Sequence, residues 1–305
     1  MRLRFEAWLV AIVAAFVGRM PMRSARNLGR AVGRLACHLD RLHRRIALDN
    51  LAHAFPSRTP AERAAIARGM FEHFGAVLFE LLKFGTLSPV QMQRLVDVEG
   101  EERLNQAYQH GRGVLLFTGH FGYWEVQGLM NPLHAHPISV LARPLDNPFL
   151  HQRLERIRTR TGNSVIYRQG AIRRVLRELA GNHGVAMLID QHLHTPDAVY
   201  VDFFGRPAAT TNALAALALR TGAPVIPAFA LPISGGRYRL IYEHAVDPPR
   251  ADTPDAIRDF TQRCTDVLEM YVRRHPELWL WMHRRWRERP APTADLAVHE
   301  ASGDL

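Results

Sequence analysis

Residues 113–125 read GVLLFTGHFGYWE. The first six form a short apolar run, which is typical of a strand buried on both faces of a sheet. Two glycines then flank His120 and permit a tight turn, and helical spacing is expected from Tyr123 to Met130. A strand, a turn and a helix in this order are the repeating unit of an α/β fold, so this stretch decides the fold class.

Four further apolar runs predict strands in the same part of the chain, at 138–142, 185–190, 224–230 and 238–243. Helical segments are predicted between them at 148–161, 172–180 and 212–221. This alternation predicts a mostly parallel mixed sheet flanked by helices. Ligands of such sheets bind beyond the carboxyl ends of the strands, so the residues that follow each strand are the candidates for a site.

The chain before the sheet is predicted to be helical. Residues 7–17 carry no charge and have arginines on both sides, but a spanning helix needs about 20 apolar residues. We expect residues 1–22 to form a membrane-anchoring helix that lies in the bilayer interface; a signal peptide and a buried core helix remain as alternatives. A helical region at 23–95, the α/β domain at 96–290 and a disordered tail at 291–305 complete the predicted organisation.

Composition narrows the function classes. The 305 residues are 47% hydrophobic, and the formal net charge of +10 comes almost entirely from arginine, since Lys83 is the only lysine. Such a surface suits nucleic acid, anionic lipid or an acidic carrier protein. No helix-turn-helix, zinc-finger or RNP-like motif is present, which argues against nucleic acid. Cys37 and Cys264 are far apart and give no disulfide framework.

No metal is expected from the pattern of possible ligands. His192 and His194 alternate after the third predicted strand, but alternate histidines at a strand end are more often polar loop residues than ligands. There is no H-E-x-x-H motif and no pair of cysteines at zinc spacing.

The candidate catalytic residues are His120 and Glu125. On one continuous helix five residues subtend about 140°, so the two side chains would diverge. If His120 lies in the turn and Glu125 in the first helical turn, the carboxylate can reach the imidazole, fix its tautomer and make it a general base. No G-x-S-x-G motif is present, and neither cysteine lies near, so the base is expected to activate a substrate hydroxyl directly.

Seven motifs in order carry a resemblance to a known family: Asn50-Leu51 with Phe55-Pro56, Val98-Glu99-Gly100, His120-x4-Glu125, Arg143 to Pro148, Asp190-Gln191, Phe203 to Thr210, and Pro276 to Trp286. From about Ile46 to Arg287 the chain resembles the lipid A late acyltransferases, the lauroyl and myristoyl transferases of Gram-negative inner membranes. Most members of the wider superfamily of glycerophosphate acyltransferases have His-x4-Asp, and the glutamate here is similar to the lipid A branch.

The resemblance implies His120 as the base and Glu125 as its partner. The implied donor is an acyl thioester on acyl carrier protein or on coenzyme A, and the implied acceptor is a hydroxyl of a lipid A precursor. No metal or other cofactor is implied. The implied location is the bacterial inner membrane, with the catalytic domain facing the cytoplasm.

Five further residues are predicted to bind substrate. Arg143 and Arg206 offer guanidinium donors to phosphate or to a developing oxyanion, and Arg173 offers them to phosphate. The alternative is a surface arginine, which suits Arg206 and Arg173 equally well. Asp190 ends the third predicted strand and Gln191 follows it, and both are expected to bind substrate. Asp190 could orient a helper arginine or line the acceptor site, or it could instead cap a turn.

The tryptophans of the last motif, Trp279, Trp281 and Trp286, suit either an interfacial belt or a packed C-terminal segment.

Three other readings stay open. The acceptor could be another glycolipid such as a phosphatidylinositol mannoside, or the same base could activate water in a thioesterase-like hydrolase. A non-enzymatic basic protein that binds membranes or nucleic acid would use the arginines alone.

Overall fold

The structure is a computed structural model, and it describes residues 1–134, 136–167, 170–193, 198–249 and 251–286. A seven-stranded sheet has the order β1-β9-β8-β2-β5-β3-β4, and β6 and β7 form a separate antiparallel hairpin. In the seven-stranded sheet, β8 and β9 pair antiparallel and the other neighbours pair parallel. The prediction of a mostly parallel mixed sheet flanked by helices is therefore confirmed.

The strands of the large sheet are β1 (Val96–Glu99), β2 (Val114–Thr118), β3 (Ile138–Leu141), β4 (Ser164–Ile166), β5 (Gly184–Leu188), β8 (Val225–Ile233) and β9 (Arg237–Tyr242), and the hairpin is β6 (Ala198–Phe203) and β7 (Arg206–Thr211). The helices among them are α6 (Glu101–Gln109), α7 (Trp124–His134), α8 (Pro148–Thr159), α9 (Ala171–Ala180), α10 (Ala213–Thr221) and α11 (Pro254–Arg274).

The strand β2 is buried on both faces, as its continuous apolar run predicts. Leu115 and Phe117 point into one hydrophobic cluster, which they share with residues of α9, α10 and α11. Val114 and Leu116 point into a second cluster, which they share with residues of α6 and α7. Because β2 is packed from both sides, the turn that follows it starts from a rigid base.

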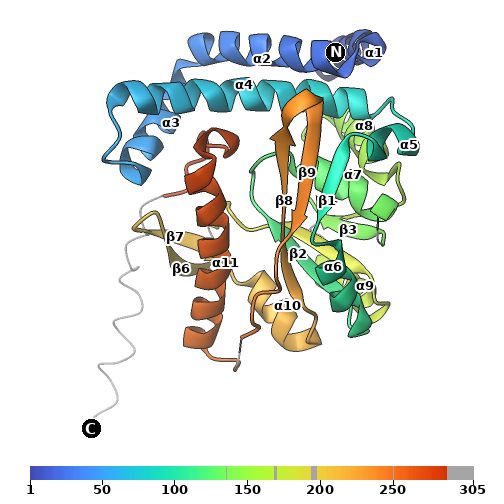
Figure 1. Cartoon of the computed structure of the whole chain (residues 1–305), viewed down its shortest axis with the longest axis vertical. Coiled ribbons are helices and arrows are strands. Elements are labelled where there is room, and N and C mark those ends of the chain that lie inside the picture. The colour runs from blue at the N-terminus through green and yellow to red at the C-terminus, as the bar shows by residue number, and fades with distance from the viewer. Residues whose placement is uncertain (135, 168–169, 194–197, 250, 287–305) are drawn as a thin grey trace.

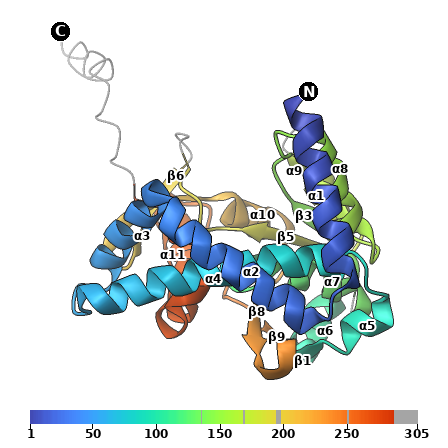
Figure 2. The ribbon, with the colours of Figure 1, turned by 90° about the horizontal axis from the view of Figure 1, so that it is seen from above.

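Five helices precede the sheet: α1 (Arg2–Arg19), α2 (Met22–Leu39), α3 (Arg41–Ala54), α4 (Pro60–Phe84) and α5 (Pro89–Gln93). Thr59 caps α4 in a capping box with Glu62, and Pro60 is its first residue. The helices α2 and α4 lie side by side across one end of the sheet (Figure 1). Seen from above, α1 turns away from α2 and lies beside α8 (Figure 2).

Glycines allow the backbones of α2 and α4 to touch. A Cβ at Gly29 would lie 2.5 Å from the carbonyl oxygen of Gly75, and a Cβ at Gly33 would overlap the carbonyl oxygen of Phe71. Ion pairs flank this contact, with Arg34 Nε 2.8 Å from a carboxylate oxygen of Glu72. The close approach leaves room only for hydrogen at these positions, so it sets the separation of the two helices.

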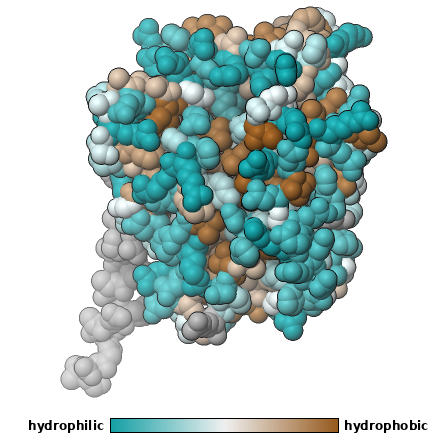
Figure 3. Space-filling view, in the orientation of Figure 1, coloured by the Kyte–Doolittle hydropathy of each residue, from teal (hydrophilic) through white to brown (hydrophobic). Residues whose placement is uncertain are grey.

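The helix α1 has a broad exposed apolar face. Phe5 and Trp8 are each 62% exposed and Phe16 is 58% exposed. No helix in the described parts of the chain is long and apolar enough to cross a membrane. On the face of the molecule shown in Figure 3, hydrophobic residues form separate small patches in a largely hydrophilic surface.

Replacement of Gly33 by alanine should destabilise the protein, because the added methyl group overlaps the backbone of α4. Overpacking of this kind costs about 1–3 kcal/mol of unfolding free energy. The matched control is Gly128→Ala in α7, where a Cβ meets only Val140 at 3.9 Å. That change should stabilise by up to about 1 kcal/mol, because alanine favours a helix. Denaturant unfolding measures both, and equal effects would contradict the proposed contact.

Candidate active site

The register of two neighbouring strands brings His120 and Asp190 together. Thr118 at the end of β2 lies opposite Leu188 at the end of β5, in a parallel pair. The backbone N–H of Ile189 donates to the carbonyl of Thr118, which continues the pairing past the strand ends. His120 and Asp190 each follow two residues after the paired ends. Both therefore lie beyond the carboxyl ends of the strands, where α/β enzymes bind their ligands.

The Asp190 carboxylate holds His120 through two hydrogen bonds. Oδ1 lies 2.8 Å from Nδ1 of the imidazole, and Oδ2 accepts from the backbone N–H of His120 at 2.6 Å. The side chain of Asp190 is 2% exposed and that of His120 is 13% exposed. Burial alone would raise the pKa of the Asp190 carboxyl, but the charge and hydrogen bonds of His120 outweigh it and hold this pKa well below its usual range. We therefore assign the proton to Nδ1 of His120, which leaves Nε2 as the basic nitrogen.

Two glycines make the turn possible. A Cβ at Gly119 would lie 2.9 Å from Oδ2 of Asp190, so any side chain there would displace the carboxylate. Gly122 has a φ of +58°, and a Cβ there would overlap the carbonyl oxygen of Ala230. The predicted role of the glycines around His120 has this physical basis: one makes room for Asp190 and the other allows the turn into α7.

The predicted contact between His120 and Glu125 is wrong. Both carboxylate oxygens of Glu125 accept from Arg158, at 2.5 Å from Nη2 and 3.0 Å from Nε. Glu125 lies in the first turn of α7 and faces α8, which carries Arg158. Burial would lower the pKa of the Arg158 guanidinium, but the hydrogen bond and charge of Glu125 outweigh it and raise this pKa. Glu125 is thus half of a buried ion pair, and its catalytic role stays a prediction.

Three side chains surround the rest of the His120 ring. Nε2 of Gln191 lies 3.5 Å from Nε2 of His120. The ring of Trp124 is 5.2 Å away and that of His283 is 4.8 Å away, measured between ring centroids. Burial, followed by the charge of the neighbouring His120, lowers the pKa of His283 to about 4. A neutral imidazole therefore faces His120 at neutral pH.

The last part of the described chain completes the site. The backbone of residues 278–280 pairs with the turn after β2: Gly122 N–H donates to the carbonyl of Leu278, and Leu280 N–H donates to that of His120. Asn50 of α3 anchors the same segment by donating to the carbonyls of Trp281 and His283, at 2.8 Å each. The segment that carries the family resemblance at the end of the chain therefore packs against the turn that holds His120.

The tryptophans in this segment are packed rather than presented to a membrane. Trp279 is 1% exposed and Trp281 is fully buried, and their rings contact each other edge to face at 4.7 Å. Trp286 stacks on Phe203. The reading of these residues as an interfacial belt is therefore wrong, and the alternative of a packed C-terminal segment is confirmed.

Buried Arg285 lies next to the site and was not among the predicted residues. Its guanidinium donates to the carbonyl of Gln191 at 3.3 Å, to that of Ala209 at 2.5 Å and to the hydroxyl of Thr210 at 2.5 Å. Burial lowers the pKa of Arg285 to about 10. The contacts tie the residue after Asp190 to the β6–β7 hairpin, so Arg285 fixes the backbone of Gln191.

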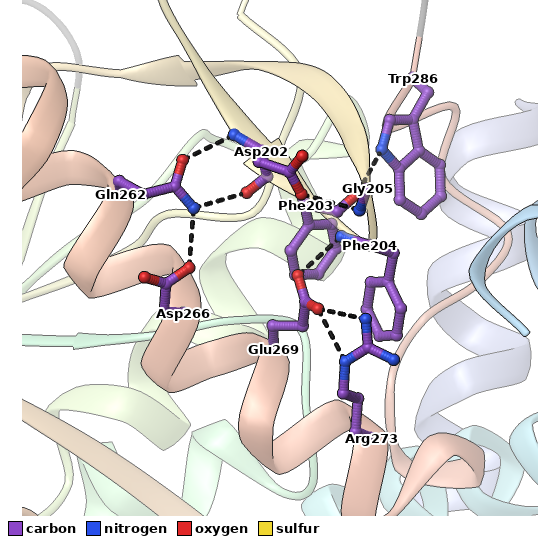
Figure 4. A network of polar contacts seen from close by, with 9 residues as sticks. All are labelled: Asp202, Phe203, Phe204, Gly205, Gln262, Asp266, Glu269, Arg273 and Trp286. Atoms are coloured by element: carbon purple, nitrogen blue, oxygen red, sulfur yellow. Dashed lines mark hydrogen bonds and ion pairs between the residues drawn. The ribbon is translucent and has the colours of Figure 1, made fainter.

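The hairpin turn is fastened to α11 (Figure 4). Phe204 has a φ of +58°, which is costly for a bulky residue. Its N–H donates to Glu269 at 2.6 Å, and Arg273 lies over its ring at 4.4 Å. The neighbouring Phe203 contacts Trp279 with ring centroids 5.4 Å apart. The hairpin therefore supports the aromatic side chains behind Asp190.

The predicted substrate-binding residues have different positions. Asp190 and Gln191 contact the imidazole of His120, as expected for residues at the carboxyl ends of neighbouring strands. Arg143 is exposed after β3 and pairs with Asp146 at 3.0 Å, Arg173 is exposed on α9, and Arg206 lies over the ring of Trp286. The structure does not bring these three arginines to His120, and their binding roles remain predictions.

The described residues contain no group of three or more histidine, cysteine or acidic side chains that could hold a metal ion. His192 lies 3.3 Å from the carbonyl oxygen of Arg285 through Nδ1. His194 and the predicted tail at 291–305 lie outside the described residues.

Comparison with known proteins identifies the family. The model of the bacterial lipid A biosynthesis acyltransferases matches residues 2–288. The chain belongs to this family. The lipid A biosynthesis myristoyltransferase of Escherichia coli (strain K12) is 25% identical over 90% of this chain and 85% of its own length. The lipid A biosynthesis lauroyltransferase of the same strain is 27% identical over 93% of this chain and 92% of its own length.

Among solved structures, a 1-acyl-sn-glycerophosphate acyltransferase from Thermotoga maritima is similar with a TM-score of 0.37 and 14% sequence identity, over 83% of this chain and 98% of that one. This likeness is too loose to support an argument. Membership of the family, with relatives that are all acyltransferases by name, makes the protein an acyltransferase.

His73 supports the turn after β2 and should make the unfolding free energy depend on pH. His73 of α4 lies 2.9 Å from the carbonyl oxygen of Gly122 through Nε2, and burial lowers its pKa to about 4. The unfolded chain binds a proton near pH 6.5 but the folded chain does not, so the unfolding free energy should fall as the pH drops from about 6.5 to 4.

Replacement of His73 by glutamine keeps a donor for Gly122 but removes the titrating group. The slope of unfolding free energy against pH in this window should fall by up to about 1.4 kcal/mol per pH unit, the value for one proton. His110→Gln, which replaces the exposed histidine just after α6, is the control, and it should leave the contribution of His73 to the slope unchanged. Denaturant unfolding between pH 4 and 7 gives the slopes, and identical slopes for all three proteins would show that His73 titrates normally.

Proposed function

We propose that this acyltransferase moves a fatty acyl chain from the thioester of acyl carrier protein to a hydroxyl of a lipid A precursor, with His120 as the general base. The observation that carries the proposal is the hydrogen bond from His120 Nδ1 to the buried Asp190 carboxylate, at the strand ends of a chain that belongs to the lipid A acyltransferase family. The names of the relatives support lipid A as the acceptor class.

The chemistry needs one base and no enzyme nucleophile. Nε2 of His120 accepts the proton of the acceptor hydroxyl, and the hydroxyl oxygen forms a bond to the thioester carbonyl carbon. The tetrahedral intermediate collapses, the carbon–sulfur bond breaks, and the thiol leaves with the proton from His120. Asp190 stabilises the imidazolium that exists between these two proton transfers and keeps Nδ1–H in place.

The roles of the two carboxylates differ in this proposal. Asp190 acts on His120 directly, whereas Glu125 acts by holding Arg158. Glu125 directly follows Trp124, whose ring contacts His120, and it holds Arg158 of α8. An arginine with an ionised partner is fixed in orientation and suits hydrogen bonding to a phosphate or a developing oxyanion.

Charge supports the choice of donor. The net charge of +10 would draw an acidic carrier protein to the enzyme and would also favour the phosphates of a lipid A precursor. Acyl coenzyme A shares the thioester and several phosphates, so it is the alternative donor. Arg143 and Arg173 are exposed, and we propose both for contacts with these phosphates.

Changes to the base and its carboxylate should reduce turnover strongly. His120→Gln removes the base, and Asp190→Asn replaces the carboxylate with a neutral amide, which lacks the charge that stabilises the imidazolium. Each should lower kcat by about 10²–10⁴-fold, the usual value of general-base assistance. The measurement is transfer of a radiolabelled acyl chain from acyl carrier protein to a purified lipid A precursor. Circular dichroism and thermal unfolding control for folding; a folded His120→Gln variant with wild-type kcat would refute the mechanism.

The same assay separates the alternatives for substrate. Release of free fatty acid without an acceptor would favour the thioesterase-like hydrolase. Acylation of another glycolipid, such as a phosphatidylinositol mannoside, with no product from the lipid A precursor would keep the mechanism and replace the acceptor. A donor series of acyl carrier protein and coenzyme A thioesters decides between the two donors by kcat/KM.

We also propose that α1 is the membrane-anchoring helix and lies in the bilayer interface, on the cytoplasmic side of the inner membrane. Its exposed aromatic residues Phe5, Trp8 and Phe16 suit the headgroup region, and Arg2, Arg4 and Arg19 suit anionic lipid. The loop before α8 lies beside it, where Asn147 donates to the carbonyl of Leu3 at 2.9 Å.

Binding to vesicles tests this anchor. Trp8→Glu places a charge on the exposed apolar face of α1 and should weaken binding to vesicles with anionic lipid by about tenfold or more, because charged side chains are costly in an apolar environment. Val90→Glu on α5 is the matched control, since Val90 is 57% exposed and lies outside α1. Co-sedimentation measures both. Equal binding by the two variants would show that α1 does not anchor the protein.

A further inference from the structure

Asp190 receives a third hydrogen bond that the proposed chemistry does not use. The indole Nε1–H of Trp279 donates to Oδ2 at 2.8 Å. The same oxygen accepts the backbone N–H of His120, while Oδ1 faces Nδ1 of the imidazole. One oxygen is thus held by two donors, and the other is left for the catalytic histidine.

The position of the Trp279 indole is determined by backbone pairing as well as by side-chain packing. Trp279 forms a β-bridge with Phe121, the residue after His120. The hydrogen bonds of Leu278 and Leu280 to the turn lie on either side of this bridge. The register between the turn and the C-terminal segment therefore places the indole N–H and the imidazole on the same carboxylate.

We propose that Trp279 is a positioning residue, which fixes the rotation of the Asp190 carboxylate so that Oδ1 stays aligned with Nδ1 of His120. The torsion of a carboxylate about its last bond has a broad energy minimum, so the donors around its two oxygens set it. Without the indole, both remaining donors in the described part of the chain belong to His120, and Trp279 is the one donor there that holds the carboxylate independently of the histidine. An indole is a donor only, so its partner oxygen is unambiguous. The inference rests on the proposed role of His120 as the base.

The competing reading is that Trp279 is simply a core aromatic residue. Its ring contacts Phe203, Trp281 and Trp286, and it is 1% exposed. A loss of activity after removal of the whole side chain would therefore prove nothing. The test must therefore separate the loss of the N–H from the loss of ring volume.

Trp281 offers a matched control. It belongs to the same aromatic group, is fully buried and also uses its indole N–H, which donates to the carbonyl of Pro276 at 2.6 Å. Its side chain does not bond to Asp190, whose indole donor is Trp279. Trp→Phe replaces a buried indole with a smaller ring and removes one hydrogen bond at either position. Only the change at 279 removes a hydrogen bond to Asp190.

The experiment compares Trp279→Phe with Trp281→Phe in the full chain. We expect kcat for acyl transfer to fall about 10- to 100-fold in Trp279→Phe, the range for loss of a hydrogen bond to a charged group, while KM stays within about twofold. Trp281→Phe should keep kcat within about threefold. Equal losses of kcat in the two variants would assign Trp279 to packing and overturn the proposal.

A second readout needs no turnover. In protein labelled with ¹⁵N in the histidine rings, the Nδ1–H proton of His120 should give a low-field resonance, which His120→Gln assigns by its loss. The resonance should shift or broaden in Trp279→Phe and stay unchanged in Trp281→Phe. If the wild-type protein transfers no acyl chain, the proposed function falls and this resonance alone decides the inference; an unchanged resonance in Trp279→Phe would overturn it.

If Trp279→Phe fails to fold, 3-benzothienylalanine at position 279 replaces it. This residue has the shape of tryptophan with sulfur in place of N–H, so packing is kept and the hydrogen bond is lost. Reduced kcat and a shifted His120 resonance in this variant would support the proposal, and wild-type values of both would refute it.

Discussion

A buried, ionised aspartate is the constraint on which the site depends. A carboxylate removed from water is stable only when hydrogen bonds and charge replace its hydration. The Asp190 carboxylate accepts hydrogen bonds from the imidazole and backbone N–H of His120 and from the indole N–H of Trp279. These donors come from the turn after β2 and from the C-terminal segment. The contacts that assemble the candidate site are therefore the same contacts that stabilise the buried charge.

The helices before the sheet take part in this assembly. Asn50 of α3 donates to two carbonyls of the C-terminal segment, and His73 of α4 lies against the carbonyl oxygen of Gly122. The close backbone contact of α2 with α4 holds this helical layer in place across the end of the sheet. A change in that layer can thus reach His120 through hydrogen bonds to the backbone, without any contact with substrate.

Much of the fold and part of the site follow from the sequence. Continuous apolar runs predicted β2, β3, β5, β8 and β9, and the strand-end rule selected His120, Asp190 and Gln191. The order of strands in the sheet is a long-range property, however, and the sequence has no local sign that β2 and β5 are neighbours. The pairing of His120 with Asp190 was missed for that reason. The sequence marks Trp279 only as one of the tryptophans of the last motif, because its partner Asp190 lies in a distant part of the chain.

The fixed spacing of His120 and Glu125 has a different meaning in this structure from the one expected. Five residues after the histidine, the carboxylate has already entered α7, and the helix turns it toward Arg158 on α8. The short spacing places the backbone of Glu125 near that of His120. The side chain of Glu125, however, points toward the neighbour with the complementary charge, Arg158. The two carboxylates therefore have different partners: Arg158 for Glu125, and the imidazole of His120 for Asp190. Of the two carboxylates, only that of Asp190, which follows β5, contacts His120 directly.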